Sequence, residues 1–202
     1  MQLLRSLMGR LTPPAASLAS VLLGLVFFSS GMAKLYAGHR FPGFIGPVWL
    51  EDALAEHGLG LLGRFIAWAQ ALIGWLLLTQ RFRALGAVML VPMLLGILLV
   101  TVSLHWQGTP YVIAVLLAMN LFLLWAERRL LLPLLTRQPA AFPEPDPPLS
   151  LPGHLAWLGA AALAAGSVWV SAFMVQAAWG MAAAGLAAAY AGRQIDRIAA
   201  RR

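Results

Sequence analysis

Apolar stretches of about twenty residues recur along this chain and constrain its fold more than any motif does. A helix needs about 20 mostly apolar residues to cross a bilayer. Segments near that length occupy residues 15–36, 62–79, 84–104, 110–126, 154–175 and 177–192. Of the 202 residues, 61% are hydrophobic and 10% are charged, which leaves no room for a large soluble domain. The expected fold class is therefore all-α, a polytopic membrane protein.

The last two segments form a nearly continuous apolar tract. It is too long for one ordinary span and just long enough for two spans joined by a tight turn near residues 176–180. One long tilted helix is the alternative interpretation.

Basic residues gather on one side of this arrangement. Eleven of the 14 fall before the first span, between the second and third, after the fourth, or after the last: Arg5, Arg10, Arg81, Arg83, Arg128, Arg129, Arg137, Arg193, Arg197, Arg201 and Arg202. The other side carries Lys34, Arg40 and Arg64. The positive-inside rule then predicts that both termini are cytoplasmic, in a bacterial-type inner membrane. An even number of spans follows, which favours the C-terminal hairpin over a single helix.

We expect three parts along the chain. Residues 1–136 form a four-helix transmembrane bundle with an outer loop, 38–61, in which Pro47 opens a short interfacial helix. Residues 137–153 contain six prolines and are predicted to be an extended cytoplasmic linker. Residues 154–202 form a two-helix transmembrane hairpin, rich in alanine and glycine, with a basic tail.

Several classes of function lack support. The absence of cysteine excludes disulfides, thiolate metal sites and dithiol redox chemistry. His39, His57 and His105 match no metal-ligand spacing, so no metal is expected, and no catalytic residue group is present. The net charge of +7 reflects the basic side of the membrane topology and favours contact with membrane lipids, with no support for a nucleic-acid partner.

Small and polar residues share one helical face in each of the first two spans, where they allow close helix packing in lipid, and the third and fourth spans have comparable stripes. The predicted packing faces are Gly24, Phe27, Ser30, Gly31 and Lys34; Gly63, Ala67, Gln70 and Gly74; Met89, Met93 and Gly96; and Ile113, Leu117, Asn120 and Leu124.

The candidate binding residues are the polar ones on these faces or at the predicted outer boundary: Ser30, Lys34, Gln70, His105 and Asn120. A helical side chain leans toward the helix N-terminus, so Lys34 should lean into the membrane toward Gln70. Lys34 is either a ligand-facing cation or a snorkelling anchor. Gln70 and Asn120 contact a ligand or hydrogen-bond between helices.

Two stretches carry a resemblance to a known family. GLVFFSSGMAKL (24–35) and FIAWAQALIGWLLLTQRFRALGAVMLVPML (65–94) resemble the first three helices of the DoxX-like membrane proteins, over roughly residues 17–135. The resemblance implies a four-helix bundle associated with membrane redox chemistry, including quinone-linked oxidation of sulfur compounds. The chain departs from the family pattern at Gln70, where that family often has a glutamate in the second helix.

Three functions follow as hypotheses. The first is a non-catalytic integral membrane subunit of a quinone-linked, respiratory-type oxidoreductase, with a pocket for a quinone or a bound phospholipid. The second is a lipid-binding or assembly protein whose hairpin docks onto other membrane-complex subunits or a second copy. The third is an autonomous quinone-dependent oxidoreductase.

Overall fold

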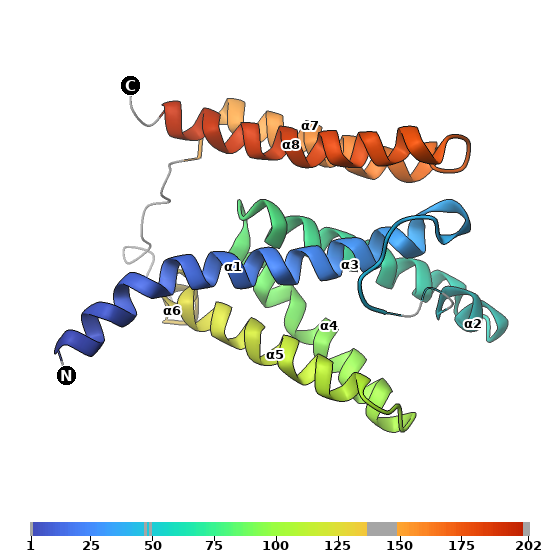
Figure 1. The fold of residues 1–202 in the computed structure, drawn as a ribbon, viewed down its shortest axis with the longest axis horizontal. Coiled ribbons are helices and arrows are strands. Elements are labelled where there is room, and N and C mark those ends of the chain that lie inside the picture. The colour runs from blue at the N-terminus through green and yellow to red at the C-terminus, as the bar shows by residue number, and fades with distance from the viewer. Residues whose placement is uncertain (1, 47, 49, 137–148, 200–202) are drawn as a thin grey trace. The chain divides into compact units, whose positions relative to one another are not determined.

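The computed structural model describes residues 2–46, 48, 50–136 and 149–199, and in these residues the regular structure is entirely helical (Figure 1). The elements are α1 (Gln2–Leu35), η1 (Ala37–His39), α2 (Leu50–Glu56), α3 (Gly60–Thr79), α4 (Arg83–Ser103), α5 (Thr109–Ala126), α6 (Arg128–Thr136), α7 (Leu151–Val170) and α8 (Val175–Ala199). The predicted all-α class is confirmed for them. Pro47 and most of the predicted linker, residues 137–148, lie outside the described residues.

In the described part of the chain, five helices are long and apolar enough to cross a membrane, as expected of a multi-pass membrane protein. They are Pro13–Leu35 within α1, and α3, α4, α5 and α7. Their bounds follow the first five predicted segments to within a few residues. The 25-residue helix α8 is not among them, and its last turns carry Arg193, Asp196 and Arg197. The sixth span therefore stays a prediction.

The C-terminal tract consists of two helices, so the alternative of one long tilted helix is wrong. The turn at Ser171–Met174 comes earlier than the predicted position near 176–180. It is closed by backbone hydrogen bonds from Phe173 and Met174 to the Val170 carbonyl. This turn contains no glycine or proline, the residues that mark most turns in a sequence, and that is why its position was misplaced.

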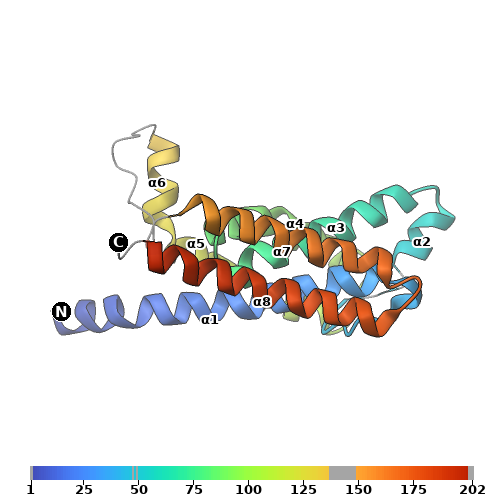
Figure 2. The same cartoon turned by 90° about the horizontal axis from the view of Figure 1, so that it is seen from above.

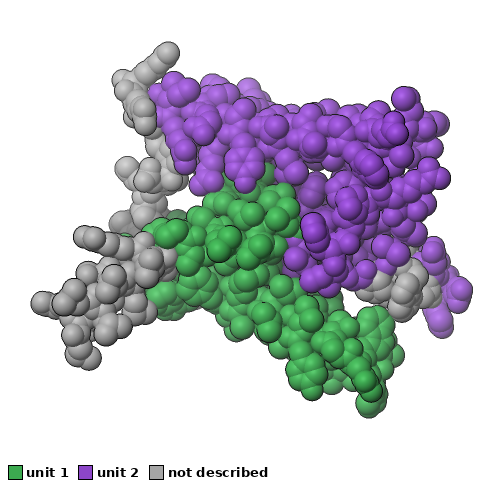
Figure 3. Space-filling model, in the orientation of Figure 1, with its two compact units in different colours: residues 1–25, 76–143 green, residues 26–75, 144–202 purple. Residues whose placement is uncertain are grey.

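The chain divides into two compact units, which are described separately (Figure 3). Unit 1 comprises residues 1–25 and 76–143, and unit 2 comprises residues 26–75 and 144–202. The division runs through α1 and α3. In unit 2 the C-terminal hairpin is grouped with the end of α1 and most of α3, a grouping that differs from the three parts expected along the chain.

In unit 2, α1 and α3 pack backbone against backbone. A side chain at Gly31 would overlap the backbone of Ala67 and Ala71, and one at Gly74 would overlap the backbone of Phe28. The small-residue faces predicted for the first and second spans are all buried. This prediction is confirmed, and the close approach brings polar side chains of the two helices within hydrogen-bonding distance.

Helix α7 runs parallel to the last part of α1. At one level Trp75 of α3 lies against both Phe28 and Trp157, with ring centroids 6.0 and 6.2 Å away. Further along both helices, Tyr36 meets Ser167. The ends of α1 and α7 therefore lie at the same level of unit 2.

Helices α7 and α8 form an antiparallel hairpin and lie side by side in both views (Figures 1 and 2). A side chain at Gly185 would press on the Ala160 carbonyl, at 2.8 Å, and Gly192 lies against Gly153. At the open end, the buried Asp196 accepts hydrogen bonds from Ser150, from the backbone N–H at 2.9 Å and from Oγ at 2.7 Å. Small-residue packing and one carboxylate thus hold the pair together.

In unit 1, α4 and α5 pack along each other, with Asn120 Nδ2 donating to the Ala87 carbonyl at 3.0 Å. The face predicted for the third span, Met89, Met93 and Gly96, is wrong, since those residues are partly or fully exposed. The buried residues of α4 are instead Gly86, Ala87, Leu90, Leu94 and Thr101. In α5 Ile113 and Asn120 are buried as predicted, together with Leu116 and Leu123 rather than Leu117 and Leu124. Both helices are apolar all round, so their periodicity does not mark the packed side.

Candidate functional site

The structure brings three of the predicted site residues together in unit 2. Lys34 lies at the C-terminal end of α1 with 5% of its surface exposed. Its Nζ donates to the Ser30 carbonyl at 3.1 Å, to Ser30 Oγ at 2.7 Å and to Gln70 Oε1 at 3.1 Å. The predicted approach of Lys34 to Gln70 is confirmed.

The hydrogen count in this cluster matches a charged lysine. An ammonium group carries three hydrogens and Nζ has three oxygen partners. The Ser30 hydroxyl then keeps its own hydrogen for Gln70 Oε1, at 3.4 Å. All three partners are neutral, and no carboxylate pairs with Lys34 in the part of the chain that the structure describes. The Lys34 ammonium therefore has all its hydrogen-bond partners but no anion beside it among the described residues. A buried charge without an opposite charge is costly in free energy.

The segment after η1 covers the ammonium group. Gly46 has φ 111°, and a side chain there would meet Ser30 Oγ at 3.0 Å and Lys34 Nζ at 3.4 Å. Only glycine suits both the backbone conformation and the close contact. The Phe44 N–H also donates to Ser29 Oγ at 3.4 Å. Lys34 is therefore enclosed, which is not the conformation of a snorkelling anchor.

Tyr36, which sequence reasoning did not single out, joins the end of α1 to the hairpin. Its hydroxyl lies 2.7 Å from Ser167 Oγ and donates to the Ala178 carbonyl at 3.1 Å. The Ala37 N–H donates to Ser171 Oγ at 3.1 Å. Burial raises the pKa of Tyr36 above its ordinary value, with the Ser167 hydrogen bond acting in the opposite direction. The partners lie more than a hundred residues away and have no recognisable spacing, so no sequence signal could have identified them.

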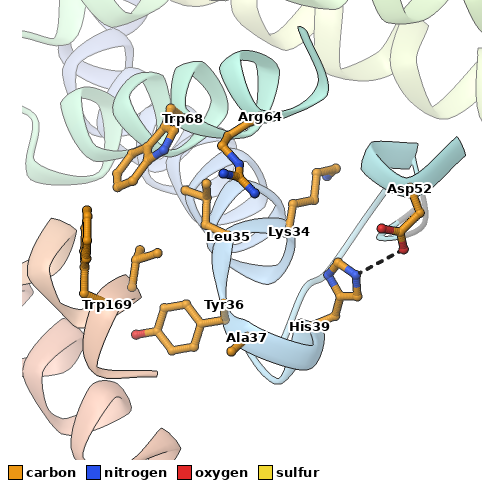
Figure 4. A pocket seen from close by; sticks show the side chains of 10 residues that line it. Lys34, Leu35, Tyr36, Ala37, His39, Asp52, Arg64, Trp68 and Trp169 are labelled. Atoms are coloured by element: carbon orange, nitrogen blue, oxygen red, sulfur yellow. Dashed lines mark ion pairs between the residues drawn. The ribbon is translucent and has the colours of Figure 1, made fainter. Parts of the chain in front are cut away.

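A cavity of about 450 Å³ opens beside this cluster within unit 2 (Figure 4). It is lined by Lys34, Leu35, Tyr36, Ala37, His39, Asp52, Arg64, Trp68, Val168 and Trp169. Figure 4 shows Arg64 reaching from α3 toward the end of α1. His39 Nε2 faces Asp52 Oδ2 at 3.7 Å, and its backbone has φ 54°, an uncommon conformation for a residue with a side chain.

Trp68 also lines a second, apolar groove of about 180 Å³, so this residue is common to both spaces. The walls of the groove are Phe28, Met32, Trp68, Ala71, Leu72, Trp75, Ala161, Ala164 and Ala165. From Trp68 to Trp75 it follows α3 for about 10 Å at 1.5 Å per residue. Unit 2 thus places a charged cavity next to an apolar groove.

The other two predicted site residues belong to unit 1 and form no part of this cluster. His105 is exposed in the turn after α4, with φ 53°. Asn120 is fully buried, and its amide bond to α4 is the interhelical contact that was one of its two expected roles. Its Oδ1 has no hydrogen-bond partner among the described atoms. The described residues contain no group of three His, Asp or Glu side chains placed to hold a metal.

Comparisons of the chain with protein-family models, curated proteins and solved structures found no match. The resemblance to DoxX-like proteins therefore stays a prediction, and the case for a function rests on the geometry of unit 2.

Proposed function

We propose that this multi-pass membrane protein binds a membrane amphiphile, with the polar head in the cavity and the tail along the apolar groove. The observation that carries the proposal is that the charged cavity and the apolar groove lie side by side and share Trp68 in their walls. An amphiphile needs a polar compartment next to an apolar one, and the cavity volume lies within the ordinary range for ligand pockets, about 300–1,000 Å³.

The level of the cavity fits a headgroup. The candidate spans of α1 and α7 end at Leu35 and Val170, and that of α3 begins at Gly60. The cavity-lining residues lie within about two helical turns of these ends. Trp68 and Trp169 are amphipathic side chains of the kind enriched where lipid headgroups meet the hydrocarbon. The groove extends from that level toward the middle of the spans.

The shared chemistry of the ligand is a head with oxygen acceptors and a long apolar tail, which both a phospholipid and a quinone supply. The biological setting that we propose is a non-catalytic subunit of a quinone-linked membrane oxidoreductase, assembled with other membrane subunits. A lipid-binding or assembly protein is the second candidate, favoured by the enclosed state of Lys34, whose three N–H groups all have protein oxygens as partners rather than a ligand.

For the topology we propose six spans with both termini cytoplasmic. Helix α8 accompanies α7 along its length, from Gly185 near Ala160 to Gly192 near Gly153, so a membrane-crossing α7 would carry α8 across with it. Single cysteines at the exposed positions Glu56 and Arg129 test this in a chain without cysteine. We expect an impermeant thiol reagent to label residue 56 from outside and residue 129 only after lysis. The reverse pattern would overturn the topology.

The binding proposal is tested by filling the groove. Ala161 lines it, and the adjacent Ala162 is exposed on the same helix and does not. We expect Ala161→Leu to lower the amount of copurified phospholipid or quinone per folded protein several-fold, and Ala162→Leu to leave it unchanged. Extraction and mass spectrometry after purification in mild detergent measure both ligands. Equal retention by the two variants would refute the groove as the tail site.

A further inference from the structure

We propose that the head of this amphiphile is anionic, as in a glycerophospholipid with a net negative charge, and that Arg64 contacts its phosphate while Lys34 supplies a fixed positive field. This rests on the proposed amphiphile site and names the charge class of its ligand. The observation behind it is that Lys34, in the wall of the cavity, is only 5% exposed and has no ionic partner among the described residues.

Among the described side chains that line the cavity, Lys34 and Arg64 are basic, and Asp52 is the one carboxylate. The partners of Lys34 among the described residues are all neutral. The Asp52 side chain is 78% exposed and faces His39, so solvent screens much of its charge. Lys34 is enclosed by α1, Gln70 of α3 and the Gly46 segment, where screening is weaker. An anion entering the cavity would offset the cost of this buried charge.

The two basic residues have different roles because Lys34 is buried, whereas the Arg64 side chain, which carries five N–H donors, is exposed. All three Lys34 hydrogens are directed at protein oxygens, so this residue acts through its field rather than by direct contact. Arg64 is exposed and reaches toward the end of α1, and its planar guanidinium suits two-pronged contact with a phosphate (Figure 4). A neutral quinone head would accept hydrogen bonds but would supply no negative charge to offset the buried ammonium of Lys34.

The test uses the full chain in nanodiscs of phosphatidylcholine doped with an equal fraction of phosphatidylglycerol or diacylglycerol with the same acyl chains, or of a quinone. Native mass spectrometry after release into detergent counts the retained molecules. We expect phosphatidylglycerol to be retained about tenfold more than diacylglycerol or quinone, the scale of one charged contact. Arg64→Gln should reduce this to the diacylglycerol level. Arg40→Gln removes an exposed arginine close in sequence to the cavity but not lining it, and should change nothing.

Each contrary result has a distinct meaning. Equal retention of phosphatidylglycerol and diacylglycerol, with both lowered by Ala161→Leu, would overturn the anionic head and leave the amphiphile site standing. Preferential retention of the quinone would also overturn the anionic head while leaving the amphiphile site standing. If Arg64→Gln and Arg40→Gln lose phosphatidylglycerol equally, the preference comes from the general surface charge of the protein and not from a contact of Arg64 in the cavity, which would overturn the proposal. If no added amphiphile is retained above background, the proposed function itself fails.

Discussion

Each unit has a cation at a helix end that links α1 to other helices, and the two differ in one respect. In unit 1, Arg83 Nε donates to Glu127 Oε1 at 2.6 Å, and Nη1 donates to Ser17 Oγ of α1 at 3.2 Å. A second nitrogen of the same guanidinium contacts the same carboxylate. In unit 2, the partners of Lys34 among the described residues are the neutral oxygens of Ser30 and Gln70.

The difference separates a structural pair from a candidate binding site. The Arg83 pair is complete in charge, and it fixes the start of α4 to the end of α5 without a ligand. The Lys34 cluster is complete in hydrogen bonds but retains a charge, and it borders a cavity. Polar residues near helix ends therefore have to be sorted by their charge partners as well as by their burial.

The largest effect is expected from breaking the complete pair. Glu127→Gln removes the anion from Arg83, and the carboxylate is only 9% exposed. We expect the apparent free energy of unfolding in detergent to fall by about 3 kcal/mol, as for partly buried pairs that lose one member. Thermal unfolding measures this. Arg83→Met combined with Glu127→Leu removes both charges and should recover at least half of the loss. A fall below about 1 kcal/mol for Glu127→Gln would class the pair with ordinary surface ion pairs.

The second prediction makes the Lys34 cluster resemble the Arg83 pair. Gln70→Glu places a carboxylate where the amide oxygen now lies 3.1 Å from Nζ. The buried charge then has an internal partner, so we expect a stability gain of about 2 kcal/mol. Because the new carboxylate offsets the charge of Lys34, retention of phosphatidylglycerol should fall several-fold. A gain in stability with unchanged retention of phosphatidylglycerol would show that the charge of Lys34 does not act on the ligand. Gln70→Met, which is similar in size and uncharged, controls for the loss of the amide.

Comparison of the helices explains how much the sequence could predict. In α1 and α3 the glycines, serines and Gln70 break an apolar background, so one helical face stands out and was predicted correctly. That face also predicted the meeting of Ser30, Lys34 and Gln70. In α4 and α5 nearly every residue is apolar, and the buried Leu90 and Leu94 cannot be told from their neighbours.

The contacts of the hairpin were not predictable for a different reason. Tyr36 with Ser167, and Ser150 with Asp196, are single hydrogen-bonded pairs across long sequence separations. No periodicity encodes such pairs. The walls of the cavity include Val168 and Trp169, which follow Ser167 in the chain, so the contact of Tyr36 with Ser167 places them beside the end of α1.

A smaller effect is expected at Tyr36. Tyr36→Phe removes the hydroxyl contacts with Ser167 and Ala178 and should lower stability by about 1 kcal/mol, the net value of a buried hydrogen bond. The raised pKa of Tyr36 adds a pH dependence. Below the ordinary tyrosine pKa of about 10 the hydroxyl is protonated in both states and the wild-type advantage is complete. As pH rises from there through the folded-state pKa, the unfolded chain loses the proton first and the advantage shrinks. Thermal unfolding of the two proteins at pH 8 and above pH 10 checks this, and a constant difference would contradict it.

The smallest effect on stability, and the sharpest test of the comparison, is expected for Lys34→Met. The change keeps the unbranched stem and removes a charge that has no ionic partner among the described residues. Loss of hydrogen bonds to Ser30 and Gln70 costs free energy, and relief of the buried charge returns some of it. We therefore expect a stability change below about 1 kcal/mol in amphiphile-free detergent, against about 3 kcal/mol for Glu127→Gln. Retention of phosphatidylglycerol should nonetheless fall several-fold, while retention of diacylglycerol stays the same. The pairing of a small stability change with a large binding change identifies a site residue. If Lys34→Met instead unfolds the protein as readily as Glu127→Gln and the remaining folded molecules keep their phosphatidylglycerol, the lysine is a structural anchor. The two cations would then differ in partners but not in role.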